Sequence, residues 1–165
     1  MSGRVLVAGV GNIFRGDDAF GCEVARRLAG RPLPPGVRVA DFGIRGHDLA
    51  YAILDGYDAV VLVDAAARGG EPGTLYALEL DPNEPADPPR LAGGHAIDLP
   101  AVFRLVRAMG GTFPPVCLVG CDPGELGPED EGLMGLSEPV AAAVGPAVGQ
   151  VEALVADLLA ELGRA

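Results

Sequence analysis

Residues that could act together in catalysis stand in three separate parts of the chain. Asp17 and Asp18 form an acidic pair directly after a glycine-rich turn, Asp64 follows the most hydrophobic run, and His95 stands in a glycine-flanked loop. Carboxylate oxygens and an imidazole nitrogen are hard and borderline metal ligands, and three such residues leave coordination positions open for a substrate. Two carboxylates that converge must share a proton or hold a cation. The pattern therefore predicts an open metal site, provided that the fold brings these residues together.

Each of these residues also has a purely structural interpretation. Acids in the first turn of a helix cap N–H groups and complement the helix dipole. Neighbouring side chains point in different directions, so one of Asp17 and Asp18 can cap while the other faces a cleft. Asp64 could cap a turn at the end of its strand. A lone histidine is usually structural, but the glycines around His95 favour a ligand-facing role, whereas His47 is predicted to be a surface group or to support the site.

Several other chemistries are disfavoured by the motifs. Gly9 and Gly11 begin a dinucleotide fingerprint, but Gly16 comes two residues late, and the acidic pair would repel a phosphate. No P-loop lysine, no His-Glu-x-x-His and no Gly-x-Ser-x-Gly is present, which argues against nucleotide, zinc-protease and serine-hydrolase chemistry. Cys117 and Cys121 are expected to be a core and a loop cysteine, because no further Cys or His lies near them.

Hydrophobic patterning predicts the element order β-α-β-α-β-β-α-β-α. The expected strands are 5–10, 37–42, 59–63, 74–80 and 116–120, and the expected helices begin near residues 17, 46, 98 and 137. The run 59–63 is predicted to be central and to end on Asp64. Only about ten residues separate it from the strand 74–80, too few for a parallel crossover, so that strand is expected to be antiparallel.

The predicted fold is a three-layer α/β/α sandwich with a mixed, mostly parallel sheet of about five strands, in a single domain over residues 1–165. The helix near 98 is expected to bury a stripe that includes Met109, and the last helix to kink at Gly145-Pro146. If the first and third strands are parallel neighbours, the acidic pair and Asp64 share the carboxyl edge of the sheet, where ligands usually bind.

The charge of the chain limits its partners. With 23 acidic and 12 basic residues, the net charge is −11, which disfavours a nucleic-acid partner. No continuous apolar run approaches the roughly 18 residues of a membrane span, and the N-terminus shows no signal-peptide pattern. We therefore expect a cytoplasmic protein without a membrane partner.

The segments that carry these residues resemble the hydrogenase maturation endopeptidases. The segment 9–21 resembles the signature G-x-G-N-x-x-x-x-D-[D/E]-x-x-G of that family, with Gly9, Gly11, Asn12, Asp17, Asp18 and Gly21 at the specified positions. The segments 61–65 and 95–99 resemble its second and third motifs, and 43–46 and 136–140 also match. The similarity therefore extends over essentially the whole chain.

The resemblance implies a mixed five-stranded sheet between helices, with Asp18, Asp64 and His95 as the metal-contacting residues. It implies an endopeptidase that recognises nickel already loaded in a [NiFe]-hydrogenase large-subunit precursor and removes a short C-terminal peptide, with no organic cofactor. Nickel would orient the tail, and the metal or a carboxylate, Asp18 or Asp64, would activate water. Gly93 and Gly94 depart from the family pattern, in which hydroxyl residues often precede the histidine.

Two other functions are compatible with the same residues. One is a non-catalytic module that binds a nickel-loaded partner without cleaving it. The other is a different small α/β hydrolase or phosphorylase-like enzyme that acts on a free small substrate. Cleavage of a precursor would exclude the first, and dependence on a protein substrate would exclude the second.

Overall fold

A computed structural model describes residues 3–83, 90–91, 97–124 and 132–164. His95 and the two glycines before it, Gly93 and Gly94, lie outside the described residues, as do residues 125–131. The predictions made for His95 are therefore not tested by the structure.

The centre of the molecule is a mixed sheet with the strand order β2-β1-β3-β6-β4. Its strands are β1 (Val5–Val10), β2 (Val37–Gly43), β3 (Ala59–Ala67), β4 (Leu75–Leu80) and β6 (Val116–Cys121). The first four strands in the order are parallel, and β4 is antiparallel to β6. The predicted antiparallel direction of 74–80 is therefore confirmed, although β4 pairs with β6. A two-residue strand, β5 (Arg90–Leu91), pairs with the end of β3 and was not predicted.

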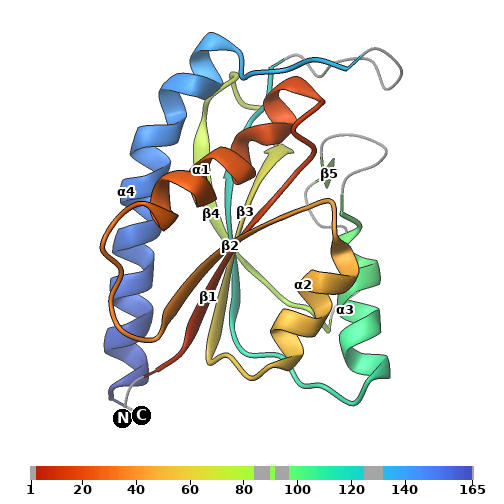
Figure 1. The fold of residues 1–165 in the computed structure, drawn as a ribbon, viewed down its shortest axis with the longest axis vertical. Coiled ribbons are helices and arrows are strands. Elements are labelled where there is room, and N and C mark those ends of the chain that lie inside the picture. The colour runs from red at the N-terminus through yellow and green to blue at the C-terminus, as the bar shows by residue number, and fades with distance from the viewer. Residues whose placement is uncertain (1–2, 84–89, 92–96, 125–131, 165) are drawn as a thin grey trace.

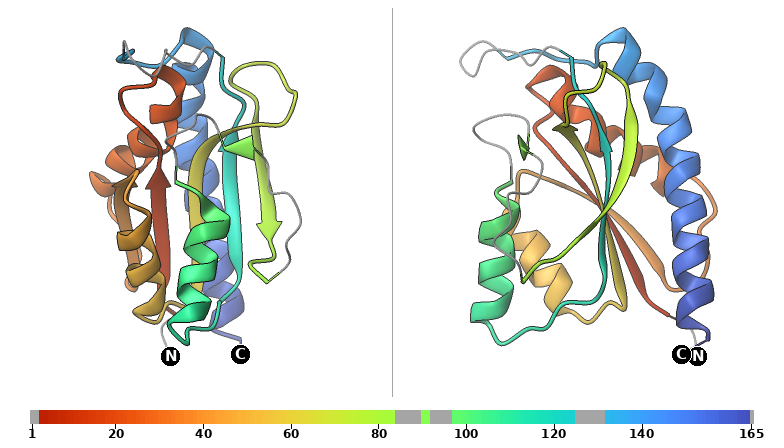
Figure 2. Two further views of the ribbon diagram at one scale, coloured as in Figure 1. Left: turned by 90° about the vertical axis from the view of Figure 1, so that its right-hand side faces the viewer. Right: turned by 180° about the vertical axis from the view of Figure 1, so that it is seen from behind.

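Helices cover both faces of the sheet, which confirms the predicted three-layer sandwich (Figures 1 and 2). On one face lie α1 (Phe20–Ala29) and α4 (Glu138–Leu162), and on the other lie α2 (Gly46–Leu54) and α3 (Leu99–Ala108). The side chains Phe20, Val24 and Leu28 recur at every fourth position of α1 and are all buried, as their spacing predicts. Each face of the sheet thus has its own hydrophobic core.

The last helix, α4, is unbroken over 25 residues and contains Pro146 in its interior. The sequence predicted a kink at Gly145-Pro146, and the helix continues through both residues. By length and composition alone α4 could cross a membrane, although the sequence has no continuous apolar run of that length. Its buried stripe, from Val140 to Leu158, packs in the core that it shares with α1 and the sheet.

Three local predictions are wrong. The strand β3 does not end on Asp64 but continues to Ala67, because this stretch still pairs with β6 and β5. Met109 lies just past the end of α3 and is 50% exposed, so it is not part of the buried stripe. Cys121 is the last residue of β6 and is fully buried, since the pairing of β6 with β4 extends to it.

Close approach between α1 and the sheet depends on two glycines of the opening segment. A Cβ atom at Gly21 would collide with the carbonyl oxygens of Val63 and Val10, and one at Gly9 would collide with the carbonyl oxygen of Gly21. Backbone atoms cannot move aside as a flexible side chain can. These glycines therefore hold the start of α1 directly over the carboxyl ends of β1 and β3.

Replacing Gly21 with Ala should lower the free energy of unfolding by about 2–3 kcal/mol, because the added methyl group must push α1 away from two strands. Gly149→Ala in α4 is the matched control, since nothing lies within 4 Å of its added methyl group. That change should be neutral or stabilising by up to about 1 kcal/mol. Urea unfolding of both variants measures the difference, and equal stabilities would contradict the packing argument.

Candidate active site

The acidic pair lies in a short 3-10 turn, η1 (Gly16–Ala19), between β1 and α1, and not in the first turn of α1 itself. Gly11 makes this turn possible. Its φ angle is +142°, and a Cβ atom there would collide with the carbonyl oxygen of Asp18. The side chain of Asn12 accepts a hydrogen bond from the Phe14 N–H at 2.9 Å, which shapes the loop before the turn. The glycines and Asn12 of the opening segment thus bring the acidic pair to the carboxyl edge of the sheet.

Asp18 is fully buried, and only one of its two carboxylate oxygens has a hydrogen-bond partner among the described residues. Its Oδ2 accepts a hydrogen bond from the backbone N–H of Asn12 at 2.9 Å. Its Oδ1 is buried and has no hydrogen-bond partner among the residues that the structure describes. Burial raises the pKa of the Asp18 carboxyl from 3.8 to about 6, against the lowering effects of the Asn12 hydrogen bond and the charge of Arg15. The Asp18 carboxyl therefore changes its protonation state at a pH closer to neutral than an exposed aspartate does.

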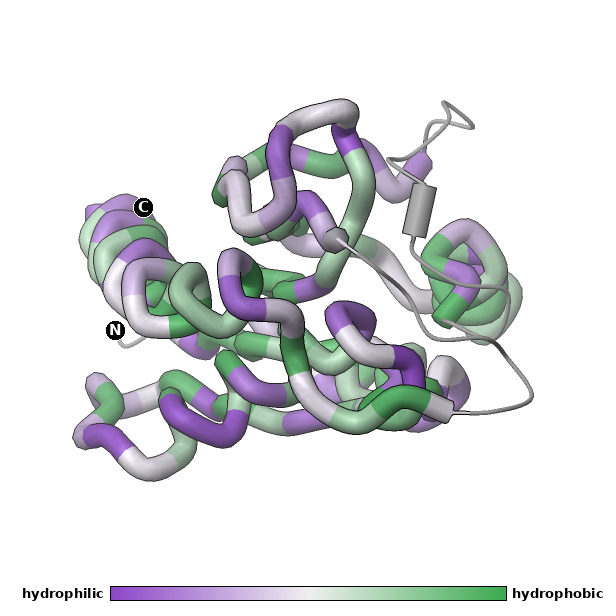
Figure 3. The backbone as a smooth tube through the Cα atoms, turned by 90° about the horizontal axis from the view of Figure 1, so that it is seen from above, coloured by the Kyte–Doolittle hydropathy of each residue, from purple (hydrophilic) through white to green (hydrophobic). Residues whose placement is uncertain are grey.

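Asp64 resembles Asp18 in its burial and in its unpartnered carboxylate oxygen. It lies in β3, is 1% exposed, and its Oδ1 lacks a hydrogen-bond partner within the described part of the chain. Burial raises its pKa well above the ordinary value, and the charge of Asp18 raises it further, while a backbone hydrogen bond from Ala65 lowers it. The two carboxylates are therefore electrostatically coupled. β1 and β3 are parallel neighbours, as predicted, and Figure 3 looks down on the end of the molecule where these strands terminate.

Asp17 has a different role from its neighbour. Its Oδ1 accepts a hydrogen bond from the Ser137 N–H at 2.7 Å, and its Oδ2 accepts bonds from the Gly124 N–H and the Ser137 hydroxyl at 2.8 Å each. The carboxylate thereby joins η1 to the segment after β6 and to the start of α4. Asp17 therefore has a structural role, as was expected of one acid of the pair, but it binds the start of a distant helix and not its own turn.

Asp41 and Cys22 also lie beside the site, and sequence reasoning assigned neither of them to it. Asp41 is near the end of β2, where its backbone pairs with Gly9, and its Oδ1 accepts a hydrogen bond from the Gly43 N–H at 2.9 Å. The Cys22 thiol is buried and donates to the Gly11 carbonyl at 3.5 Å. Burial, then the hydrogen bond with Asp41, raises the pKa of Cys22, so the thiol stays protonated and is a poor nucleophile. The position of Asp41 near a strand end, like that of Asp64, was the available signal.

The predicted metal ligands are brought together only in part. Asp18 and Asp64 converge, but within the described residues no group of three or more His, Cys, Asp and Glu side chains could hold a metal ion. His95, the predicted third ligand, lies outside those residues. His47 is exposed near the start of α2, which agrees with its prediction as a surface group. The described residues therefore provide two carboxylates and no complete metal centre of their own.

Three kinds of comparison with known proteins agree with one another. A family model described as hydrogenase maturation protease matches residues 22–154. The Hydrogenase 2 maturation protease of Escherichia coli (strain K12) is 33% identical over 150 residues, covering 90% of this chain and 88% of that protein. The hydrogenase expression/formation protein HupD of Rhodobacter capsulatus is 33% identical over 165 residues, covering 96% of this chain and 71% of that protein. The solved structure of the hydrogenase maturating endopeptidase HybD from E. coli matches with a TM-score of 0.75 and 30% identity, covering 93% of each chain.

Proposed function

This chain belongs to the hydrogenase maturation protease family and is a peptidase, and on that premise we propose that it removes a C-terminal peptide from a nickel-loaded [NiFe]-hydrogenase large-subunit precursor. In this proposal nickel belongs to the substrate and serves as the recognition element. Asp18 and Asp64 contact it, and His95 supplies a third ligand. The reaction takes place in the cytoplasm and needs no organic cofactor.

The pair of buried carboxylate oxygens without hydrogen-bond partners is the observation that carries the proposal. Oδ1 of Asp18 and Oδ1 of Asp64 have no hydrogen-bond donor in the described part of the chain, and burial disfavours the charge on both groups. Leaving such atoms unsatisfied costs free energy, so they are retained where a ligand satisfies them. A divalent cation supplies what both oxygens lack, because one ion neutralises two carboxylates that otherwise repel each other.

The same carboxylates suit the chemistry of peptide hydrolysis. With a pKa of about 6, the Asp18 carboxyl is mostly deprotonated at neutral pH and is a stronger base than an exposed aspartate. In the proposed reaction, the substrate's nickel orients the tail at the carboxyl edge of the sheet. The metal or a carboxylate, Asp18 or Asp64, activates the water that attacks the peptide bond.

The test is a cleavage assay on the large-subunit precursor from the same organism, prepared with and without nickel. We expect loss of a C-terminal peptide, seen by mass spectrometry, only from the nickel-loaded precursor. Nickel-dependent complex formation without cleavage would replace the proposal with a binding module. Cleavage of both precursors would remove nickel as the recognition element, and the absence of both binding and cleavage would point to a different peptidase substrate.

A further inference from the structure

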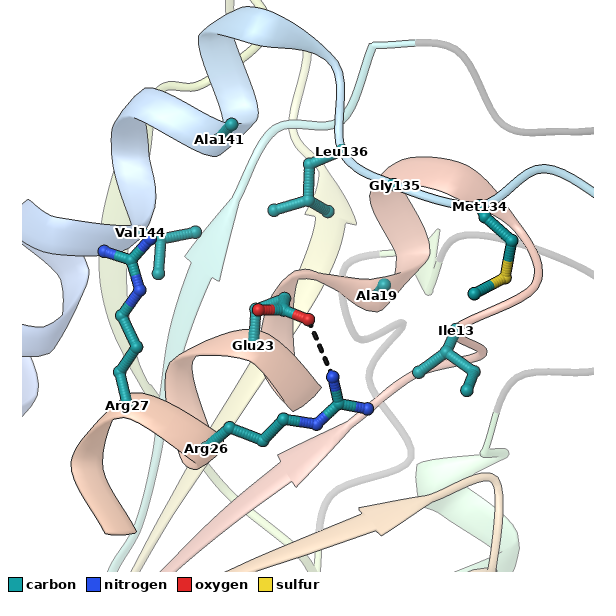
Figure 4. Close-up of a pocket in the computed structure, with 10 residues that line it drawn as sticks. All are labelled: Ile13, Ala19, Glu23, Arg26, Arg27, Met134, Gly135, Leu136, Ala141 and Val144. Atoms are coloured by element: carbon teal, nitrogen blue, oxygen red, sulfur yellow. Dashed lines mark hydrogen bonds and ion pairs between the residues drawn. The ribbon is translucent and has the colours of Figure 1, made fainter. Parts of the chain in front are cut away.

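A cavity of about 320 Å³ opens between α1, α4 and the segment 134–136 (Figure 4). Its apolar wall includes Ile13, Leu136 and Val144, and its rim carries Arg26 and Arg27 from α1. None of the residues assigned to the carboxylate site lines it. The cavity is therefore a separate feature, and its chemistry combines apolar surface with positive charge.

The two arginines differ in how they are paired. Arg26 donates to the Glu23 carboxylate at 2.9 Å, and Figure 4 shows this bond among the residues that line the cavity. The guanidinium of Arg27 lies beside Val144 and forms no hydrogen bond or ion pair with any residue that the structure describes. The Arg27 guanidinium thus places a positive charge, uncompensated within the described residues, beside the apolar wall of the cavity. The Arg27 guanidinium can donate two parallel hydrogen bonds to a single carboxylate.

The cavity adjoins the segments that hold the acidic pair. Ala19 follows Asp18 directly, and Ile13 follows Asn12, whose N–H binds Asp18. On the other side, Leu136 precedes Ser137, which donates two hydrogen bonds to Asp17. The same chain segments therefore border the cavity and hold the acidic pair.

Two exposed apolar side chains extend this surface, Met134 in the lining of the cavity and Phe14 on the loop beside it. Phe14 is 59% exposed and Met134 is 67% exposed. The loops that carry them are fixed side by side, because the Leu133 N–H donates to the Phe14 carbonyl and the Gly16 N–H donates to the Leu133 carbonyl, at 2.7 Å each. Large exposed apolar side chains next to a pocket are typical of a surface that binds another chain.

We propose that this cavity binds a segment of the polypeptide substrate in which an apolar side chain stands next to an Asp or Glu. The apolar side chain fills the space against Ile13 and Val144, and the carboxylate pairs with Arg27. The choice of a polypeptide rests on the proposed function, while the apolar and acidic character of the segment follows from the lining. The cavity thus selects the substrate at a distance from the bond that is cleaved.

The first test measures binding without cleavage. Overlapping synthetic peptides that span the C-terminal region of the large-subunit precursor are titrated against the native protein by fluorescence polarisation. We expect binding by peptides in which an apolar residue adjoins Asp or Glu, weakened about tenfold or more in Arg27→Gln and further in Arg27→Glu. Arg27→Lys keeps the charge but loses the paired donors, so its affinity should fall between that of the native protein and that of Arg27→Gln. Added salt should weaken native binding more than binding to Arg27→Gln.

Two further variants separate pocket binding from general charge effects. Arg104→Glu makes the same charge reversal at an exposed position of α3, on the opposite face of the sheet, and should bind peptides as the native protein does. Ala141→Phe keeps the charge but fills the cavity from α4, and should weaken binding as much as Arg27→Gln. Thermal unfolding of each variant checks that the fold is retained.

The outcomes for the cavity and for the proposed function can be told apart. If no peptide binds, or if Arg27→Glu and Ala141→Phe bind as the native protein does, the inference about the cavity is overturned. Arg27-dependent binding of acidic, apolar peptides supports the cavity even where the precursor is not cleaved, in which case the proposed function fails alone. If the nickel-loaded precursor is cleaved, Arg27→Glu should raise the KM for that precursor and leave kcat within about twofold of the native value.

Discussion

Substituting Asp64 or Asp18 with Asn is expected to slow cleavage of the nickel-loaded precursor by about 10²–10⁴-fold while the protein stays folded. Asn has nearly the shape of Asp and fits the same space, but it carries no negative charge for a cation and cannot act as a base. The two carboxylates are coupled, because the charge of Asp18 raises the pKa of Asp64. Each single substitution should therefore cost nearly as much activity as the double substitution.

A buried carboxylate at the same end of the molecule provides the matched control. Asp122 is 3% exposed, but its Oδ1 accepts hydrogen bonds from the backbone N–H groups of Arg68 and Gly70 at 2.6 and 3.3 Å. An amide oxygen can accept the same bonds, so Asp122→Asn should process the precursor at close to the native rate. Native-like turnover by Asp18→Asn or Asp64→Asn, or an equal loss in Asp122→Asn, would refute the assignment.

The pH dependence of stability offers a second measurement on the same variants. The Asp18 carboxyl has its pKa raised from 3.8 to about 6, and Asp64 has its pKa raised well above the ordinary value. A carboxyl whose folded-state pKa is raised contributes stability that is fully present below the unfolded pKa and is lost as pH rises through the folded pKa. From these groups alone, the native protein should lose stability from about pH 4 upward.

Asp64→Asn removes the Asp64 part of this loss. Its free energy of unfolding should increasingly exceed that of the native protein as the pH rises above about 4, and the two should approach each other below about pH 4. Urea unfolding at several pH values tests this prediction. A variant that loses activity and gains stability at neutral pH would show that the buried charge is retained for function and not for the fold. An Asp64→Asn protein less stable than the native one at pH 8 would contradict the assigned pKa direction.

The fold and part of the site could be predicted because their signals are local. The continuous apolar runs of β1 and β3, and the short connection to β4, were enough to predict the sheet and the shared edge. The coupling of Asp18 with Asp64 follows from that edge alone. The extent of β3 past Asp64 could not be predicted, because it depends on pairing with β5 and β6, which are distant in the chain. The place of Arg27 in the cavity could not be predicted either, because the cavity forms only where α4 packs beside α1.

Asp17 shows most clearly what sequence patterns cannot reveal. Its partner Ser137 is 120 positions away in the chain, and no spacing rule connects the two. The sequence predicted only that one acid of the pair, Asp17 or Asp18, could cap its own helix. In the structure Asp17 connects three segments of the chain, and these segments also border the carboxylate site and the cavity.

Asp17→Ala is therefore expected to lower the free energy of unfolding by about 4 kcal/mol, the largest stability effect predicted for this chain. The change removes a fully buried acceptor of three hydrogen bonds and leaves the N–H groups of Gly124 and Ser137 without it. Hydrogen bonds to a charged group contribute about 1.5–3 kcal/mol each, and partial hydration of the freed donors reduces their sum.

Ser137→Ala separates the parts of this effect, because it removes only the hydroxyl bond to Asp17 and keeps the backbone N–H of residue 137. It should cost about 1–2 kcal/mol, and the double variant should be less destabilised than the sum of the two, since the groups share one network. Additive effects would show that Asp17 and Ser137 act independently. An Asp17→Ala protein of native stability and native activity would mean that other contacts hold the start of α4. It would also mean that Asp18 is the only member of the acidic pair that stability and activity require.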